Sequence, residues 1–433
     1  MLPLAMVFAV PACEFGDDGS GGGFTTSAGD ATGNGSTTGN GSTTGAGAGG
    51  PGQPGWTVIP MLDDESDPQN IVYHSGNTLV TGIYFASIDD GYVVSAGANQ
   101  TFSYGGAVFR AKQKEVTEVL FSGNQTATCA LGTTDFIGIE ATPGGYMAKA
   151  FACDLVSSKD GGATFGVERA GAGDAFGLED TLALRHLKSG ALMVRETGVI
   201  SRTSSSPGPT AVWTDTWAPG AVPPIPNPVP ADQCQSGPES QGVPSIDQAA
   251  YVSPNGQLIA YTSSPDHDPQ ICISNDGGES FYPKLLAGVA EDVLFAPPTG
   301  VVFTTPTNGI TFYANSLYAG RGYVFHTTDG GESWSKVELP VDVANKRIEL
   351  QRAFFAPDGD HGWLVGFDYD SSVALLLKTS DGGASWQMSG GDLAAKVAES
   401  GGGKLSTGFA LDANHIWVGG DDGIFAANAA GGE

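Results

Sequence analysis

One short pattern occurs four times in this 433-residue chain, and it constrains the fold more than any other feature. Each copy reads Ser/Thr-x-Asp-Gly-Gly-x-Ser/Thr-aromatic, with the aromatic residue five positions after the aspartate. The aspartates stand at positions 160, 276, 329 and 381, so the last two intervals are 53 and 52 residues and the first, 116, is about two periods. Such a repeat indicates one supersecondary unit used several times. The repeated aspartates and aromatics are Asp160, Phe165, Asp276, Phe281, Asp329, Trp334, Asp381 and Trp386.

The Asp-Gly-Gly core of the pattern predicts a tight turn. The carboxylate accepts hydrogen bonds from nearby backbone N–H groups, and glycine adopts the positive φ that other residues resist. The flanking hydroxyls can bond within the same turn, and the aromatic residue then begins a new strand. This combination resembles the Asp-box (BNR) repeat of sialidase-like β-propellers. The resemblance implies that each copy closes the turn between the two outer strands of a blade and is structural rather than catalytic.

The remaining blades are predicted from their inner hairpins, in which two apolar strands flank a Gly, Asp or Asn turn. Residues 56–433 number 378, and 378/7 is 54, close to the interval between the clean repeats. The sequence therefore predicts an all-β fold, a seven-bladed β-propeller over residues 56–433. Seven segments fit the hairpin pattern, at residues 82–94, 136–147, 182–194, 250–261, 293–303, 353–365 and 409–418.

The last predicted blade lacks one strand. It ends after Ile424–Asn428 without an Asp-Gly-Gly turn, whereas Trp56-Thr57-Val58 looks like an outer strand that has no blade. We expect the N-terminal strand to pair beside Ile424–Asn428 and close the ring, which leaves no open seam. This arrangement is similar to single-domain propellers of the photosystem II stability/assembly factor type, and only the fold is carried over from them.

The first 55 residues differ in composition from the rest. Residues 1–13 form an apolar stretch that ends in Val10-Pro11-Ala12-Cys13, which resembles a bacterial lipobox and implies a lipoprotein signal peptide with lipidation at Cys13. Residues 14–55 are rich in Gly, Ser and Thr and predict a disordered tether. The expected location is the bacterial cell envelope, at the outer membrane or cell surface. The alternative is that Cys13 is an ordinary cysteine.

The other cysteines and the charge bear on the compartment and the partners. The four remaining cysteines favour disulfides Cys129–Cys153 and Cys234–Cys272, and the alternative is four reduced, buried thiols. No CxxC or Cys/His cluster occurs, so no metal or cofactor is predicted. A net charge of −28 argues against nucleic acid and against electrostatic docking to anionic lipid. We expect a monomer that reaches the membrane only through its lipid anchor.

Ligand binding is predicted on the face opposite the Asp-Gly-Gly turns, where loops join the second strand to the third and one blade to the next. Acidic and aromatic side chains there suit a glycan or a peptide, and Asp-x-Asp pairs suit Ca²⁺ although no complete calcium loop is present. The plain alternative is a set of solvated loops. The candidate residues are Asp266, His267, Asp268, Tyr313, Tyr318, Arg321, Arg347, Arg352, Asp368, Tyr369 and Asp370.

No catalytic residues are predicted. An active site like that of the sialidases needs three arginines, a Tyr nucleophile with a Glu partner, and an Asp acid/base, and that family carries a Phe/Tyr-Arg-Ile-Pro motif. None of the eight arginines of this chain lies in such a motif. Nucleophile elbows, HExxH and P-loops are also absent. We therefore expect a non-catalytic envelope lipoprotein whose propeller binds a protein or a glycan. The alternative is a secreted glycan-active hydrolase or lyase of the sialidase-like superfamily.

Overall fold

The computed structural model describes residues 55–61, 78–97, 107–122, 136–142, 145–150, 155–158, 160–168, 181–187, 190–195, 198–204, 213–215, 250–253, 255, 257–263, 270–276, 281–286, 298–313 and 322–432. Residues 1–54 lie outside this set, so the predicted signal peptide, the lipidated Cys13 and nearly all of the tether remain predictions.

Strands dominate the described residues and form seven four-stranded antiparallel sheets. Sheet one contains β2 (Thr78–Ser87), β3 (Asp90–Gly97), β4 (Ala107–Lys112) and β5 (Glu115–Ser122). Sheet two contains β6 (Phe136–Thr142), β7 (Gly145–Ala150), β8 (Leu155–Ser157) and β9 (Gly166–Glu168). Sheet three contains β10 (Thr181–Leu187), β11 (Gly190–Arg195), β12 (Gly198–Ser204) and β13 (Trp213–Asp215). Sheet four contains β14 (Ala250–Val252), β15 (Ile259–Ser263), β16 (Gln270–Ser274) and β17 (Tyr282–Leu285).

The C-terminal half continues in the same way. Sheet five contains β18 (Gly300–Phe303), β19 (Gly309–Tyr313), β20 (Tyr323–Thr327) and β21 (Ser335–Val337). Sheet six contains β22 (Ile348–Phe355), β23 (Gly362–Asp368), β24 (Val373–Thr379) and β25 (Gln387–Met388). Sheet seven contains β26 (Leu405–Ala410), β27 (Ile416–Gly420), β28 (Phe425–Asn428) and β1 (Thr57–Val58). Two short helices, α1 (Val341–Ala344) and α2 (Leu393–Glu399), follow the outer strands of sheets five and six.

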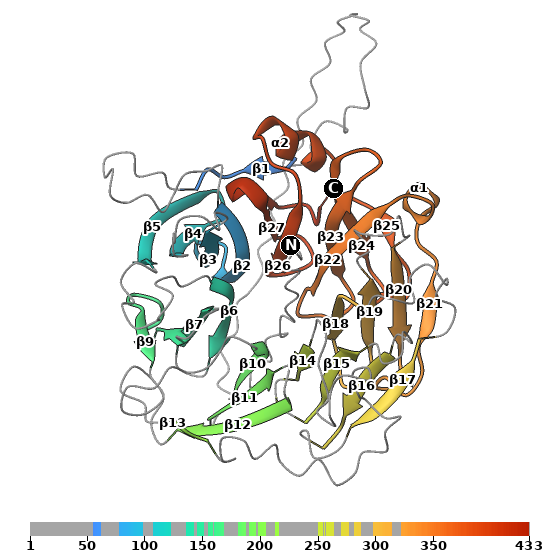
Figure 1. Cartoon of the computed structure of the whole chain (residues 1–433). Coiled ribbons are helices and arrows are strands. Elements are labelled where there is room, and N and C mark those ends of the chain that lie inside the picture. The colour runs from blue at the N-terminus through green and yellow to red at the C-terminus, as the bar shows by residue number, and fades with distance from the viewer. Residues whose placement is uncertain are drawn as a thin grey trace, which may run out of the picture.

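The sheets follow one another around a common centre, with the first strand of each sheet innermost (Figure 1). Contacts join the first strands of neighbouring sheets: β2 with β6, β10 with β14, β14 with β18, β18 with β22, β22 with β26, and β26 back to β2. The chain thus brings sheet seven beside sheet one.

The predicted pairing of the two ends of the domain is present. Strand β1 runs antiparallel to β28, with Thr57 opposite Ala427 and Val58 opposite Ala426. The backbone N–H of Ile59 extends the ladder to the carbonyl of Phe425 at 2.7 Å. The N-terminal strand therefore supplies the fourth strand of sheet seven.

The inner hairpins agree with the predicted segments in six sheets and differ in sheet five. The sequence predicted that Val301-Val302-Phe303 forms the second strand of its hairpin, but these residues belong to the first strand, β18, which pairs with β19. The Thr304 N–H bonds to the carbonyl of Asn308 at 2.9 Å, so the turn lies at residues 304–308. That segment contains Pro306-Thr307-Asn308 and is followed by Gly309, which is stronger turn chemistry than the segment chosen from the sequence.

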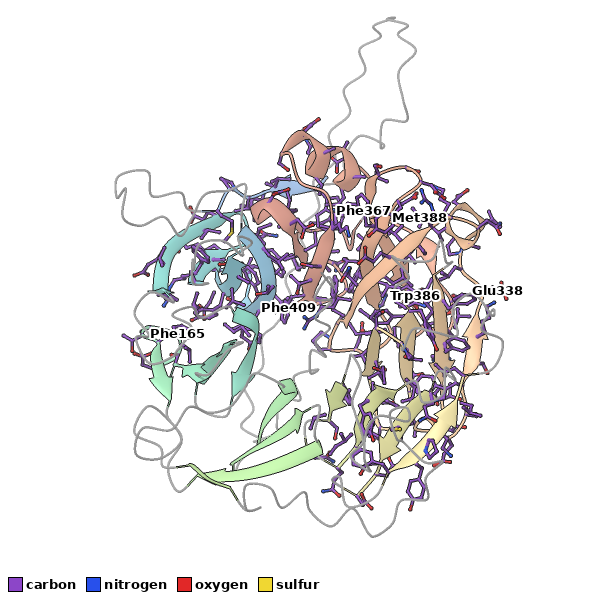
Figure 2. All side chains as sticks on the ribbon, in the orientation of Figure 1. Phe165, Glu338, Phe367, Trp386, Met388 and Phe409 are labelled. Atoms are coloured by element: carbon purple, nitrogen blue, oxygen red, sulfur yellow. The ribbon has the colours of Figure 1, made fainter. Side chains whose placement is uncertain are left out.

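The described core consists of apolar side chains packed between consecutive sheets. Phe409, labelled in Figure 2, lies at the interface between sheets seven and one: its ring centroid is 5.4 Å from that of Tyr84, and nearby the rings of Trp417 and Phe85 stack with centroids 3.8 Å apart. Similar clusters join sheets one and two, sheets four, five and six, and sheets six and seven. Within the described residues, no helix is both long and apolar enough to cross a membrane.

The Asp-Gly-Gly turns have the geometry that their chemistry predicts. The Thr327 hydroxyl donates to Asp329 Oδ1 at 2.8 Å and accepts from the Gly331 N–H at 2.9 Å. The Ser333 hydroxyl and N–H donate to the two carboxylate oxygens of Asp329 at 2.6 and 2.9 Å, which lowers the pKa of Asp329 to about 2. Gly330 and Gly331 have φ of 75° and 86°. The turns at Asp160 and Asp381 repeat these bonds.

Two sequence features of sheet four are described only in part. Ser274 donates to Asp276 at 2.7 Å, and residues 277–280 of that copy lie outside the described residues. Cys272 is buried in β16 and is disulfide-bonded. Because Cys129, Cys153 and Cys234 lie outside the described residues, the two predicted pairings remain predictions.

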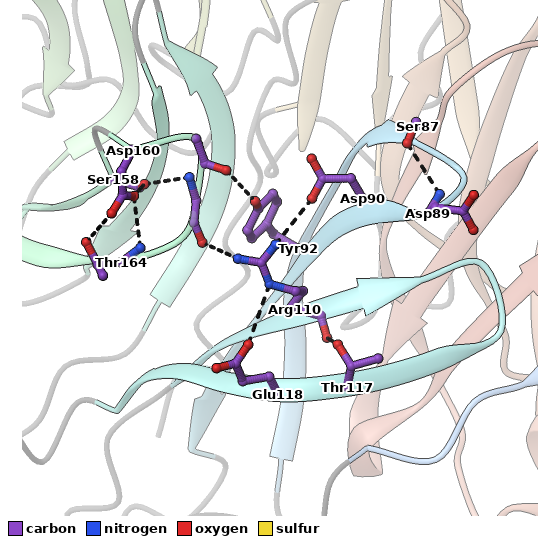
Figure 3. A network of polar contacts seen from close by, with 12 residues as sticks. Ser87, Asp89, Asp90, Tyr92, Arg110, Thr117, Glu118, Ser158, Asp160 and Thr164 are labelled. Atoms are coloured by element: carbon purple, nitrogen blue, oxygen red, sulfur yellow. Dashed lines mark hydrogen bonds and ion pairs between the residues drawn. The ribbon is translucent and has the colours of Figure 1, made fainter.

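Each fully described turn fastens its sheet to the preceding one. Figure 3 shows the turn at Asp160 beside Tyr92 and Arg110 of sheet one. The Tyr92 hydroxyl donates to the Gly161 carbonyl at 3.0 Å, and the Arg110 guanidinium donates to the Gly162 carbonyl at 2.7 Å. The turns at Asp329 and Asp381 lie in the same way against Ile273 of sheet four and Ile310 of sheet five. These turns are structural, which leaves the opposite ends of the sheets as the place to look for a ligand site.

Candidate functional site

Four of the predicted face residues come together at one end of sheet six. Arg347 immediately precedes β22, and Asp368, Tyr369 and Asp370 stand where β23 ends. The turn at Asp381 lies at the other end of the sheet, since the Gly382 N–H donates to the carbonyl of Asp360 between β22 and β23 at 2.9 Å. The predicted residues Asp266, His267, Asp268, Tyr318 and Arg321 lie outside the described residues.

Ion pairs fix the loops at this end of sheet six. Arg347 Nε donates to Asp370 Oδ1 at 2.7 Å, and Lys346 Nζ donates to Asp368 Oδ2 at 2.7 Å. The Asp368 side chain is only 3% exposed. Burial opposes ionisation of Asp368, but hydrogen bonds from Lys346 and Ser371 outweigh it and lower its pKa. These contacts hold the chain on both sides of Tyr369 in place.

Tyr369 itself belongs to a group of ionisable side chains between sheets six and seven. We call Glu349, Tyr369, Lys404 and Asp421 the Tyr369 cluster. Lys404 Nζ donates to Glu349 Oε2 at 2.9 Å and to the Tyr369 hydroxyl at 2.7 Å. The Tyr369 hydroxyl also donates to Glu349 Oε2, and the Gln351 amide donates to Glu349 Oε1. The Glu349 carboxylate therefore receives donors on both oxygens.

Burial and hydrogen bonding set the charge states in the cluster. Burial raises the pKa of Tyr369, and its bond to Glu349 raises it further. For Lys404, burial opposes the charge, yet the bonds to Tyr369 and Glu349 outweigh it and raise the pKa. Burial raises the pKa of Asp421, against the opposing charge of Lys404. The Glu349 side chain is 8% exposed and that of Lys404 is 35% exposed, so Lys404 is the more exposed partner of this ion pair.

An aromatic pair flanks the cluster. The rings of Phe367 and Tyr369 meet edge to face with centroids 5.1 Å apart, and both side chains are half-buried. Lys404 Nζ lies 4.9 Å from the Tyr369 ring centroid and 5.8 Å from that of Phe367, close enough for cation–π attraction. Aromatic faces beside a charged pair can contact both apolar and polar parts of a ligand.

The backbone explains how Glu349 and Lys404 reach each other. In β22 the pairing register with β23 shifts after Leu350, which stands opposite Gly366. In β26 the register with β27 shifts after Leu405, which stands opposite Gly420. A Cβ at either glycine would lie 1.9 Å from the carbonyl oxygen of Glu349 or Lys404. The two charged residues therefore occupy equivalent positions in consecutive sheets, each next to a β-bulge. Bulges of this kind often re-aim side chains near functional sites.

Backbone conformations at the same end point to function as well. Among described residues other than glycine, Ser372 and Asp422 are those with positive φ, both at 56°. Ser372 precedes β24 in the loop after Tyr369, and Asp422 lies between β27 and β28, next to Asp421 of the cluster. Such conformations are sparsely populated and concentrate at functional sites.

Two predicted face residues have core positions instead. Tyr313 is the last residue of β19 and is fully buried, 6.3 Å from the ring of Tyr323, and burial raises its pKa. The sequence had placed it on a loop because the hairpin of sheet five was assigned one strand too early. Arg352 is 5% exposed within β22, and burial lowers its pKa to about 9.

Sequence reasoning missed Glu349, Lys404 and Asp421. Lys404 had a usable signal, because a charged residue between three glycines and an apolar strand marks a strand entrance. No sequence signal indicated the ion pair with Glu349, because the two residues belong to different sheets and are 55 positions apart in the sequence. Within the described residues, no group of three or more His, Cys, Asp or Glu side chains is arranged to hold a metal ion.

Comparisons with known proteins agree on the fold. No family model matches the chain. A curated relative, the chloroplastic photosystem II stability/assembly factor HCF136 of Guillardia theta, is 46% identical over 54 residues, which span 12% of this chain and 11% of the relative. The matched segment is thus a small part of either protein.

Solved structures match over most of the chain. YCF48 from Cyanidioschyzon merolae has a TM-score of 0.54 at 13% identity, covering 86% of this chain and 98% of that one. A structure described as YCF48 bound to D1 peptide has a TM-score of 0.52 at 13% identity, covering 82% and 92%. A GH74 xyloglucanase from Xanthomonas campestris has a TM-score of 0.52 at 16% identity, covering 83% of this chain and 53% of the enzyme. At these identities the likeness shows the fold, a β-propeller of this type.

Proposed function

We propose that the chain is a seven-bladed propeller, closed by its N-terminal strand, that acts as a non-catalytic binding module. The ligand is a protein segment or a glycan, and it binds at the Tyr369 cluster. We further propose that lipidation at Cys13 holds this monomer at the bacterial cell envelope, and that the predicted disulfides stabilise it there.

The observation that carries this proposal is the hydrogen-bond network that holds the polar side chains of the cluster in place. Glu349 accepts from Lys404, Tyr369 and Gln351, and Lys404 donates to both Glu349 and Tyr369. Side chains held this way present a fixed pattern of charge and aromatic surface, which suits recognition. The solved neighbour described as bound to D1 peptide supports a protein segment as the first ligand to test.

Binding arrays test the proposal. The full chain is applied to a peptide array and to a glycan array, and each hit is measured again with Tyr369→Ala and Lys404→Met. We expect a loss of affinity of at least tenfold, because each change removes half of a central polar contact. Leu285→Ser is the matched control, since this 66%-exposed side chain lies on the outer strand β17 of sheet four. Hits that bind equally to all variants would place the ligand elsewhere.

One observation favours the second candidate, a glycan-active hydrolase. The sialidases that the repeats resemble need a Tyr nucleophile with a Glu partner and an Asp acid/base. Tyr369 bonds to the buried carboxylate of Glu349, and Asp421 has the raised pKa expected of an acid. A panel of aryl glycosides tests this function. Turnover that Tyr369→Phe or Asp421→Asn abolishes would replace the binding proposal, whereas binding without turnover would support it.

A further inference from the structure

The segment 389–404, which we call the strap, connects the outer strand of sheet six to the first strand of sheet seven. Near its start it contacts the N-terminal strand. The backbone N–H of Trp56 donates to Asp392 Oδ1 at 2.9 Å, across 336 residues of sequence. Trp56 is 3% exposed and packs in one cluster with Leu393 and Val397 of α2. The helix therefore lies against the residue that immediately precedes the closing strand, β1.

The other end of the strap is Lys404 of the Tyr369 cluster. Between α2 and Lys404 stand Gly401, Gly402 and Gly403, of which Gly401 has a φ of 83°. A Cβ at Gly402 would lie 2.3 Å from Ile424, a residue in the same cluster as Trp56, so the glycine run passes closely over that side chain. The Lys404 carbonyl then accepts from the Asp421 N–H at 3.0 Å. One continuous segment thus touches both the closing strand and the candidate site.

The strap depends on these contacts for its shape. A helix of seven residues such as α2 is too short to be stable alone, so its form comes from the packing of Leu393 and Val397 against the cluster that contains Trp56. The glycine run is tied to the helix, because the Gly401 N–H donates to the Ala398 carbonyl and the Gly402 N–H to the Val397 carbonyl, both at 3.1 Å, so a displacement of α2 is passed on to Lys404. When Trp56 leaves its site, α2 loses a packing partner and the position of Lys404 is no longer fixed from that side.

We propose that docking of Trp56 holds Lys404 in the Tyr369 cluster through the strap, so that release of the N-terminal strand opens the candidate site. The closing strand then has a second role beyond completing sheet seven. Because the residues before Trp56 lead to the N-terminus, a pull on that part of the chain acts directly on this contact. That the opened surface is a ligand site rests on the proposed function.

Amine labelling of the folded full chain tests the proposal. Lys404 donates to two acceptors and is 35% exposed, so it should react slowly with an acylating reagent, whereas Lys112 on β4 of sheet one is 48% exposed, lies outside the strap and serves as an internal reference. Mass spectrometry of the proteolysed product gives the rate at each lysine. We expect Trp56→Ala and Asp392→Ala to raise the rate at Lys404 by about tenfold, the scale of a local opening equilibrium that loses one buried contact.

Trp334→Ala is the matched control. Trp334 holds the equivalent position before the outer strand β21 of sheet five, but it does not pack in the cluster that contains the strap residues. An unchanged Lys404 rate in Trp56→Ala, or an equal rise in Trp334→Ala, would overturn the proposal. If Trp56→Ala does not fold, Asp392→Ala decides alone, because it removes one hydrogen bond and leaves the Trp56 packing in place. A ligand that fails to bind the Tyr369 cluster leaves this result unaffected and counts only against the proposed function.

Discussion

Replacement of Gly420 by alanine isolates the close approach of two strands in sheet seven. Gly420 has φ −170° and ψ −157°, an extended conformation open to any residue, so alanine brings no backbone strain of its own. Its Cβ would lie 1.9 Å from the Lys404 carbonyl oxygen and 2.9 Å from the carbonyl carbon. Both atoms are backbone, so no side-chain rotation relieves the clash. The bulge in β26 has to move by about an ångström.

The magnitude follows from two opposing terms. Overpacking of a tight interior site costs about 1–3 kcal/mol, and the rigid backbone contact places this case near the upper end. Replacing glycine restricts the unfolded chain and returns about 0.4–1 kcal/mol. We therefore expect Gly420→Ala to lower the free energy of unfolding by about 2 kcal/mol. The same shift displaces Lys404, so binding at the Tyr369 cluster should weaken as well.

Urea unfolding followed by tryptophan fluorescence measures the effect. Gly403→Ala is the matched control one residue before Lys404, since its Cβ would meet no atom within 4 Å. We expect that variant to unfold within about 0.5 kcal/mol of the unmodified protein. If Gly420→Ala is as stable as Gly403→Ala, the close approach does not constrain the bulge and the reasoning fails.

Three further predictions concern the cluster and the turns. Glu349→Gln and Lys404→Met should be non-additive in urea unfolding, with a coupling energy of about 1 kcal/mol after allowance for the solvent-exposed part of Lys404, and additive effects would contradict the ion pair. The pKa of Asp329 is lowered to about 2, so the contribution of its carboxylate to stability is complete above the ordinary value of 3.8 and is lost as the pH falls through 2. Asp329→Asn should therefore make the melting temperature less dependent on pH between these values. An unchanged slope of melting temperature against pH would refute the lowered pKa. Tyr92→Phe removes the bond to the Gly161 carbonyl and should cost about 1 kcal/mol in the same unfolding assay, whereas an unchanged midpoint would show that the turn is held by packing alone.

Local chemistry made the fold predictable. Asp-Gly-Gly with its flanking hydroxyls specifies the turn within eight residues, and the structure forms those bonds at Asp160, Asp329 and Asp381. The pairing of the N-terminal strand with the last sheet was also predictable, because the last sheet lacked a strand and the segment after Trp56 was a strand without a sheet. Sheet five was predicted wrongly, because the apolar segments 293–295 and 301–303 could each be its first strand. The turn at residues 304–308 shows that residues 301–303 belong to the first strand.

The candidate site was predicted only in part. Tyr369 and its acidic neighbours follow a strand end in sequence, so their common location was accessible. The Glu349–Lys404 pair depends on the packing of two neighbouring sheets and on bulges that glycines at 366 and 420 permit. A bulge leaves little trace in a sequence, because it changes the direction of a side chain without changing its residue type. Tertiary geometry of this kind has to be observed.

The direction in which the turns fasten has a consequence for how such a chain evolves. Gly162, Gly331 and Gly383 each have a side chain of the preceding sheet in the space that a Cβ would fill. A newly duplicated unit therefore already carries the Asp-Gly-Gly turn that contacts the preceding unit. To be contacted by the following unit, it must also have a side chain like Tyr92, Ile273 or Ile310 at the matching place. A change at Tyr92, Ile273 or Ile310 would therefore weaken the attachment of the next unit while leaving the Asp-Gly-Gly motif of its own unit intact.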